Sequence, residues 1–218
     1  MIPITDTEDL KSFILRRNDM KPCKTAFIDA RSPGSDQKEN YCLIGGGVAE
    51  NPSQVVHINT PHGFDVGAAR QPTGCKNSHH SHDTEEVFVV HKGQWKFTWG
   101  EDGSDGEVVL DSGDTISIPT QLFRGFENVG DHNGFLFSVL GHLPNGTPGR
   151  VTWAPYVFDE AKKHGLVLLQ DGRLIDTHAG QSVPDNQPLY EPVCGEELKA
   201  FKTLAMEDMV KNVSRHAD

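Results

Sequence analysis

Gly74-Cys-Lys-Asn-Ser-His-His80-Ser-His82-Asp-Thr-Glu-Glu86-Val-Phe-Val-Val-His-Lys-Gly93 is the stretch that decides the fold of this chain. His80 and His82 are two residues apart, so their side chains lie on the same face of an extended strand. Glu86 keeps that parity and can join them when the chain turns into the next strand. Two imidazoles and one carboxylate suit a divalent transition metal. The stretch therefore predicts a metal site at His80, His82 and Glu86.

A surface turn rich in histidine and acidic residues is the alternative for this stretch, because a single His-x-His pair is a weak indicator of metal binding. His79 and His91 have the opposite parity. We expect their side chains to point away from the site, unless a strand bulge changes the register. The flanking glycines and Glu86 make the pattern more specific, so we favour the metal site.

The order Gly74, five residues, His80, one residue, His82, three residues, Glu86, six residues, Gly93 resembles the first motif of the cupin superfamily. Members of that superfamily fold as small antiparallel β-barrels of the jelly-roll kind, also called a double-stranded β-helix. The resemblance implies an all-β fold with one bound divalent transition metal: Fe, Mn, Ni, Cu or Zn.

A second cupin-like motif follows, in which Gly113 precedes Pro119 by six positions and Asn128 comes nine positions after the proline. Cupins usually carry a glycine two residues after this proline and a metal-binding histidine five residues after it. This chain has Gln121 and Arg124 at those places. The first motif is thus complete, whereas the second departs from the pattern at the fourth metal ligand.

Arg124 allows two arrangements of the site. In the first, its guanidinium pairs with Glu86 and displaces the metal, because arginine keeps its charge and repels a divalent cation. In the second, His80, His82 and Glu86 hold the metal with open positions, and Arg124 binds a substrate carboxylate, enolate or other anion. We favour the second, with Arg124 and Glu86 as catalytic residues, because the first leaves both histidines without a role.

Other polar features add less. A distant residue can supply the fourth ligand, and Gln121, His57 and His142 are the candidates. The three glycines at 45–47 lack the Lys and Ser/Thr of a P-loop, so we interpret them as a turn or a bulge.

Short apolar runs separated by turn residues follow one another along the middle of the chain, which is typical of a sandwich or barrel. Within one of these runs Trp95, Phe97 and Trp99 share a parity, and we expect most of them in the barrel core. The strands that we expect lie at 26–28, 41–44, 55–60, 64–71, 86–91, 94–99, 108–110, 115–119, 122–128 and 135–140.

The chain divides by pattern into an N-terminal arm at 1–50, the barrel at 51–145 and a C-terminal extension at 146–218. The arm begins with a helix capped by Thr5. The extension contains a helix that starts near Pro155, a hairpin around the Asp-Gly turn at Gly172, and an amphipathic helix after Gly195. These extensions offer surface for a homodimer, which is common among cupins of this size.

The chain has 20 Lys and Arg against 31 Asp and Glu, a net charge of −11. This acidic balance argues against binding to nucleic acid or to an anionic membrane. The sequence shows no signal region and no apolar run long enough to cross a bilayer. Its four cysteines are scattered, so we expect a reduced, cytoplasmic protein.

The resemblance implies a metal-dependent enzyme that acts on a small organic substrate. Dioxygenase-like oxidative cleavage of an enolic or catecholic compound is the reaction that we favour. A metal-dependent isomerase or lyase would use the same residues without oxygen, and a non-catalytic, small-molecule-binding or sensing cupin is the alternative outside enzymes. Fold alone does not choose among these.

Overall fold

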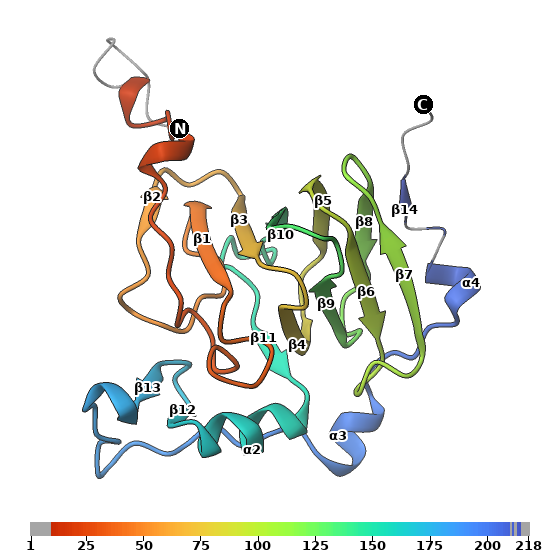
Figure 1. The fold of residues 1–218 in the computed structure, drawn as a ribbon. Helices are drawn as coiled ribbons and strands as arrows, with labels where there is room; N and C mark the ends of the chain where they lie inside the picture. Colours follow the sequence, from red (N-terminus) through yellow and green to blue (C-terminus); the bar gives the residue numbers. More distant parts are fainter. Residues whose placement is uncertain (1–9, 210, 212, 215–218) are drawn as a thin grey trace.

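Two β-sheets that face each other form the centre of the molecule, as the jelly-roll expectation required (Figure 1). The structure is a computed structural model and describes residues 10–209, 211, 213 and 214. The expected all-β fold class is confirmed. Among the described residues, no helix is both long enough and apolar enough to span a membrane.

The larger sheet has seven strands and forms one wall of the barrel. Its neighbours are antiparallel except for β1 and β2, which run parallel. In spatial order its strands are β14 (Val213–Ser214), β8 (Thr115–Ile118), β5 (Glu86–Lys92), β10 (Gly134–Gly141), β3 (Phe64–Gln71), β1 (Glu39–Ile44) and β2 (Val56–Ile58).

The smaller sheet has five antiparallel strands and forms the other wall. In spatial order its strands are β11 (Val151–Trp153), β4 (Lys76–His82), β9 (Arg124–Asn128), β6 (Trp95–Trp99) and β7 (Gly106–Leu110). Two strands from outside the expected barrel region of 51–145 pair with strands inside it. β1 of the arm pairs with β3, and β11 of the extension pairs with β4. The arm and the extension therefore complete the walls of the barrel.

The barrel core lies between the two sheets and is strongly aromatic. Trp95, Phe97 and Trp99 are at most 1% exposed and do not line the cavity that contains His80 and His82, as we expected for core residues. Period-two alternation accounts for this, because β6 directs every second side chain inward. A second apolar cluster joins Trp153 and the helix of the extension to Ile28 of the arm.

The remaining elements are short. They are η1 (Arg17–Asp19), α2 (Pro155–Lys163), β12 (Leu166–Leu168), β13 (Leu174–Asp176), η2 (Thr177–Ala179), α3 (Gly195–Lys199) and α4 (Met206–Met209). Pro155 opens α2, and the Asp-Gly turn joins β12 to β13, as expected. Gly165 adopts a φ of +77° just past α2, which is the backbone conformation that ends helices at glycine.

Two expectations about the ends of the chain need correction, and a third falls on residues that the structure does not describe. Residues 26–28 are buried turns and not a strand, because their backbone bonds go to neighbouring loops. The tail after Gly195 forms two short helices instead of one, since the chain between α3 and α4 pairs with the barrel near Leu122. The cap expected at Thr5 lies outside the described residues, and the described part of the arm begins with helical backbone at residues 10 and 11.

Candidate metal centre and its cavity

The three residues predicted to bind a metal meet inside the barrel. His80 and His82 lie on β4, and Glu86 is the first residue of β5. One ligand atom from each lies within 4.8 Å of the other two. All three side chains are buried, with exposed fractions of 3 to 5%. Period two along β4 and the turn into β5 therefore place these donors as the sequence predicted.

Both imidazoles are held in an orientation that suits a ligand. Nδ1 of His80 donates to the backbone carbonyl of Ser78 at 2.8 Å, and Nδ1 of His82 donates to that of Arg150 at 3.2 Å. Burial lowers the pKa of His80 and of His82 well below the ordinary value, and the charge of Arg124 lowers both further. The rings are thus neutral, and the Nε2 lone pairs remain for a metal.

Arg124 points at the centre from β9 and pairs with Glu86. One terminal nitrogen donates to the Glu86 carboxylate, and the other donates to the backbone carbonyl of His80 at 3.0 Å. Its Nε–H is buried without a hydrogen-bond partner among the described residues. Burial raises the pKa of Glu86, and the nearby guanidinium opposes that rise. This is the ion pair expected for the first of the two arrangements.

The donor set nevertheless fits a divalent transition metal. Two neutral imidazoles and a carboxylate converge, and each imidazole Nδ1 is anchored by a backbone carbonyl. This is the two-histidine, one-carboxylate set, with the outer hydrogen bonds typical of metal-binding histidines. The opposing feature is the positive charge of Arg124, which already neutralises Glu86. His80, His82 and Glu86 could therefore hold a metal if Glu86 turned from Arg124 to the ion.

None of the three residues considered as a fourth ligand joins this group. His57 bonds through Nδ1 to the carbonyl of Cys42 and through Nε2 to the backbone N–H of Lys21. His142 bonds to Asp65, and Gln121 is exposed. All three are thus committed to other partners or directed to solvent.

The two histidines of opposite parity lie away from the centre, as expected. His79 bonds to Tyr156 and to Thr98 on the other face of the small sheet. His91 is exposed on the large sheet and packs edge-on against Phe135 and Phe137. Strand alternation therefore separates them from His80 and His82.

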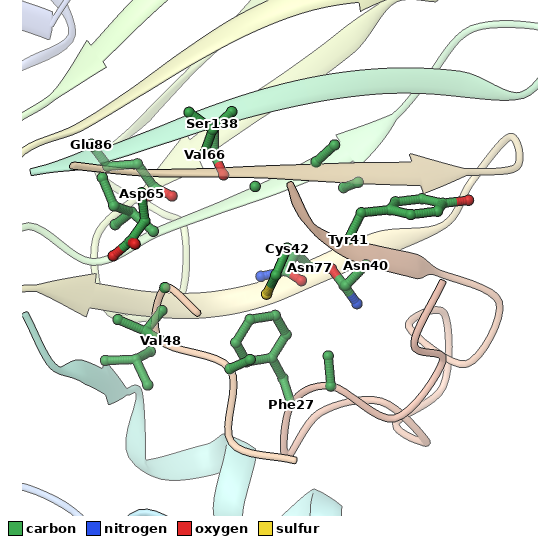
Figure 2. A pocket seen from close by; sticks show the side chains of 18 of the residues that line it. Phe27, Asn40, Tyr41, Cys42, Val48, Asp65, Val66, Asn77, Glu86 and Ser138 are labelled. Carbon is green, nitrogen blue, oxygen red and sulfur yellow. The ribbon is translucent and has the colours of Figure 1, made fainter. Parts of the chain in front are cut away.

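A cavity of about 80 Å³ lies beside His80, His82 and Glu86 (Figure 2). Its walls are mostly apolar, and Trp153 packs against His80 with ring centroids 5.0 Å apart. Arg124 does not line this cavity, because its guanidinium is turned to Glu86 and is covered. In this arrangement the side chain of Arg124 therefore faces Glu86 and not the cavity.

The N-terminal arm supplies much of the cavity wall, which the sequence did not indicate. Phe27, Tyr41, Cys42 and the glycines at 45–47 line it, together with residues of the large sheet (Figure 2). The three glycines were the available signal, since such a run permits close backbone approach. The sequence pattern by itself predicts only a turn or a bulge there.

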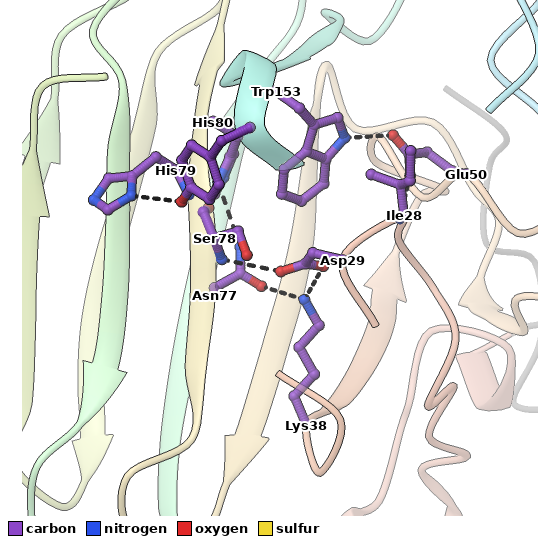
Figure 3. Close-up of polar contacts among 10 residues, drawn as sticks. Ile28, Asp29, Lys38, Glu50, Asn77, Ser78, His79, His80 and Trp153 are labelled. Carbon is purple, nitrogen blue, oxygen red and sulfur yellow. Dashed lines mark hydrogen bonds and ion pairs between the residues drawn. The ribbon is translucent and has the colours of Figure 1, made fainter. Parts of the chain in front are cut away.

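A buried polar network of the arm supports β4 behind the site (Figure 3). The Lys38 ammonium donates to the carboxylate of Asp29 and, at 2.8 Å, to the side-chain carbonyl of Asn77. Asp29 also accepts from the backbone N–H of Ser78 at 2.9 Å. Lys38 and Asp29 are fully buried. The arm therefore fixes the backbone just before His80.

Glu50 anchors the indole that packs on His80 (Figure 3). Its carboxylate accepts from Nε1 of Trp153 at 2.6 Å and from the backbone N–H of Ile28 at 2.7 Å. Burial raises the pKa of Glu50 to about 8, against the lowering effect of these bonds. A buried carboxylate thus joins the arm to the first residues of the extension.

A family model described as a cupin domain matches residues 69–140. The comparison with curated protein sequences found no significant match. Among solved structures, the vicilin of hazelnut (Corylus avellana) is 13% identical with a TM-score of 0.45, over 65% of this chain and 36% of that one.

Two structures of metabolic enzymes are similarly distant. The oxalate decarboxylase of Lactobacillus farciminis, a formate complex, is 16% identical with a TM-score of 0.42, over 57% of this chain and 31% of that one. The structure titled as the DMSP lyases RdDddP and RnDddQII is 18% identical with a TM-score of 0.40, over 52% of this chain and 51% of that one. The match thus spans between about a third and a half of these proteins, and similarity at this level carries no argument about activity.

Proposed function

Because a cupin-domain model matches residues 69–140, we propose that this chain is a metal-dependent enzyme that acts on a small organic molecule inside the barrel. The observation that supports this proposal is the convergence of His80, His82 and Glu86 within 4.8 Å, next to a cavity. His80 and His82 would each offer Nε2, and Glu86 would offer a carboxylate oxygen. A divalent metal bound there would act as a Lewis acid toward substrate oxygen atoms.

The cavity favours a compact substrate that enters without negative charge. Its volume of about 80 Å³ favours a small ligand. The lining contains no Lys or Arg but contains the carboxyl groups of Asp65 and Glu86. An enolic compound of a few heavy atoms suits this cavity better than a flavonoid-sized molecule or a carboxylate.

Within the proposed enzyme, Arg124 has a positioning role. It pairs with Glu86 and opposes the rise in pKa that burial causes, so it favours the ionised carboxylate that could turn to a metal. Trp153 and Phe27 exclude water from the face of the site that they cover. Oxidative cleavage of an enolic compound is the reaction that we propose to test first, because two histidines and one carboxylate with open positions are the set used by non-haem iron oxygenases.

A non-catalytic binding protein is the second candidate, and the pair between Arg124 and Glu86 favours it. A buried carboxylate that is already neutralised by arginine has less electrostatic attraction for a cation. In that case the cavity would bind a small neutral molecule without metal. The two candidates differ in metal content.

Elemental analysis of protein purified without chelator or metal-affinity column tests the proposal. We expect near one equivalent of transition metal per chain in the wild type, and at least a tenfold weaker metal affinity in His80→Ala and in His82→Ala, since each loses a ligand. His79→Ala is the matched control, because His79 is adjacent but bonds to Tyr156 and Thr98. It should keep the metal.

Oxygen consumption with small enolic compounds then separates the reaction classes. Metal-dependent oxygen uptake supports oxidative cleavage, whereas substrate conversion without oxygen uptake supports an isomerase or a lyase. A wild type that binds no metal even after reconstitution, or variants of His80 and His82 that keep it, would contradict the proposed site and favour the binding protein.

A further inference from the structure

The carboxylate of Asp65 and the imidazole of His142 form a second polar pair at the cavity. We propose that this pair recognises a substrate by its enolic hydrogen, with Asp65 as the group that accepts this hydrogen as a proton and His142 as the residue that positions Asp65. This inference rests on the proposed function, since it names the substrate class of the same cavity. It assigns a role to two residues outside the cupin motifs.

The strand register places Asp65 and Glu86 at the same level across the large sheet, with both side chains directed into the barrel. Leu140 of β10 is directly opposite Glu86 of β5 on one side and Asp65 of β3 on the other. Residues opposite each other in a sheet point to the same face. With strands about 4.8 Å apart, the backbones of Asp65 and Glu86 are about 10 Å apart. Both side chains line the one cavity, and Figure 2 shows them with Ser138 along this wall.

His142 and Gly45 hold the Asp65 carboxylate in place. Nε2–H of His142, just past the end of β10, donates to one oxygen of Asp65 at 2.9 Å. A Cβ added at Gly45 would come within 1.6 Å of the other oxygen, and Gly45 has a φ of +70°. Only glycine therefore permits this backbone to approach the carboxylate so closely. This close approach gives a specific role to the first of the three glycines, for which the sequence predicted only a turn or a bulge.

The negative charge of Asp65 acts within the cavity. The nearby thiol of Cys42, which also lines the cavity, has its pKa raised to about 12 by burial and, next, by the charge of Asp65. Glu86 is neutralised by Arg124, and no Lys or Arg lines the wall. Asp65 thus pairs with the imidazole of His142, whereas Glu86 pairs with the guanidinium of Arg124.

This arrangement selects a ligand with an acidic hydrogen. A carboxylate in an apolar cavity repels an anion and gains a strong hydrogen bond from a hydroxyl group. In the proton transfer, the O–H bond of the enol breaks, a new O–H bond forms on Asp65, and the electron pair remains on the enolate oxygen. Negative charge moves from Asp65 to the substrate, so no oxidant or reductant is needed. The enolate so formed is the species that a cation at His80, His82 and Glu86 would attract.

Binding of a matched pair of ligands tests this role. Acetylacetone has an enol, whereas 3,3-dimethylpentane-2,4-dione cannot form one. We expect calorimetry on zinc-loaded and on metal-free protein to show that the wild type binds acetylacetone more tightly than the dimethyl compound. In Asp65→Asn, acetylacetone should bind at least tenfold more weakly, while the affinity for the dimethyl compound should stay within twofold. The zinc content should stay unchanged.

Variants of His142 test its positioning role, and a variant of the distant Asp171 is the control. His142→Leu should weaken acetylacetone binding in the same direction, and His142→Gln, which keeps an N–H donor, should restore part of it. Asp171→Asn changes an exposed carboxylate of the hairpin and should alter neither affinity. The enolate absorbance of acetylacetone bound to the zinc-loaded wild type should exceed that in zinc-loaded Asp65→Asn at a pH where the free ligand is protonated, which checks the proton transfer.

The outcomes separate this inference from the proposed function. Equal affinity of wild type and Asp65→Asn for acetylacetone, or an equal loss for both ligands, would overturn the role of Asp65. Enol selection that depends on Asp65 in a protein that takes up no zinc would support that role and overturn the metal-dependent function. Loss of zinc in Asp65→Asn would overturn the role as stated, since Asp65 would then act through the metal site.

Discussion

At the scale of single residues, Arg124 determines the charge balance of the site. It is 1% exposed and pairs with Glu86, which is 4% exposed. Removing one partner of a buried ion pair leaves the other charge uncompensated and costs about 3–5 kcal/mol. We expect Arg124→Ala to lower the free energy of unfolding of the metal-free protein by this amount in a urea titration. Arg70→Ala, which removes an exposed pair with Glu39, should cost at most about 1 kcal/mol.

Arg124→Ala should increase metal affinity, because it removes a positive charge next to the proposed ligands. We therefore expect zinc to raise the melting temperature of Arg124→Ala more than that of the wild type. Arg124→His, which restores an imidazole at the place usual for cupins, should bind zinc more tightly than the wild type. Weaker zinc binding in both variants would show that Arg124 assists the metal and does not compete with it.

At the scale of elements, the N-terminal arm holds β4 through Lys38. The ammonium joins Asp29 to Asn77, and Asp29 bonds to the backbone of Ser78. We expect Lys38→Met to destabilise the protein by about 3–5 kcal/mol, because Asp29 would remain buried without its partner. Where the protein is still folded, zinc affinity should fall about 10- to 100-fold, as for other residues that orient metal ligands.

The control for the arm is Lys163→Met, which removes an exposed pair with Glu160 in α2. It should leave the unfolding free energy within about 1 kcal/mol and leave zinc affinity unchanged. Hydrogen exchange on β4 provides an independent measurement, since loss of the Lys38 contacts should speed exchange there and not in β6. Unchanged exchange in Lys38→Met would show that β4 is held by its sheet partners alone.

At the scale of the whole molecule, buried ionisable groups set the pH range of stability. The pKa values of His80 and His82 lie well below the ordinary value of 6.5 in the folded protein. Below that pH the unfolded chain therefore takes up protons that the folded protein does not, and stability is lost as pH falls. Glu50 has its pKa raised from 4.5 to about 8 in the folded protein. Between these pH values the folded protein holds a proton on Glu50 that the unfolded chain has released, so the stability of the fold decreases as pH rises toward 8.

We therefore expect the metal-free wild type to be less stable at pH 8 than at pH 6.5, with Glu50 contributing up to about 1.4 kcal/mol per pH unit. Glu50→Gln should be less stable overall, because the two hydrogen bonds fall on different carboxylate oxygens and one of these becomes an NH2 group. Its slope between pH 6.5 and 8 should be shallower. Urea titrations at four pH values measure both quantities. An unchanged slope would show that Glu50 is ionised when folded.

Local patterns made most of the fold and part of the site predictable. Alternation with period two placed β3 at its observed bounds and put His80, His82 and Glu86 on the inner face. The same alternation separated His79 from the site. Such features depend on neighbours a few residues away, and the family resemblance at residues 74–93 supplied the closure of the barrel. The strand predicted at residues 26–28 was wrong, because the apolar side chains there are buried by contacts with the extension and not by pairing in a sheet.

The sequence by itself thus determined the strand series, the inward face of β4 and the three donor atoms, because the geometry of a strand follows from adjacent residues. Only the tertiary structure decided what surrounds them. The bonds from Arg124 to Glu86, from Trp153 to Glu50 and from His142 to Asp65 join residues 38, 103 and 77 positions apart. Pairings of that kind arise when the two sheets and the arm pack together, and no local period in the sequence encodes them.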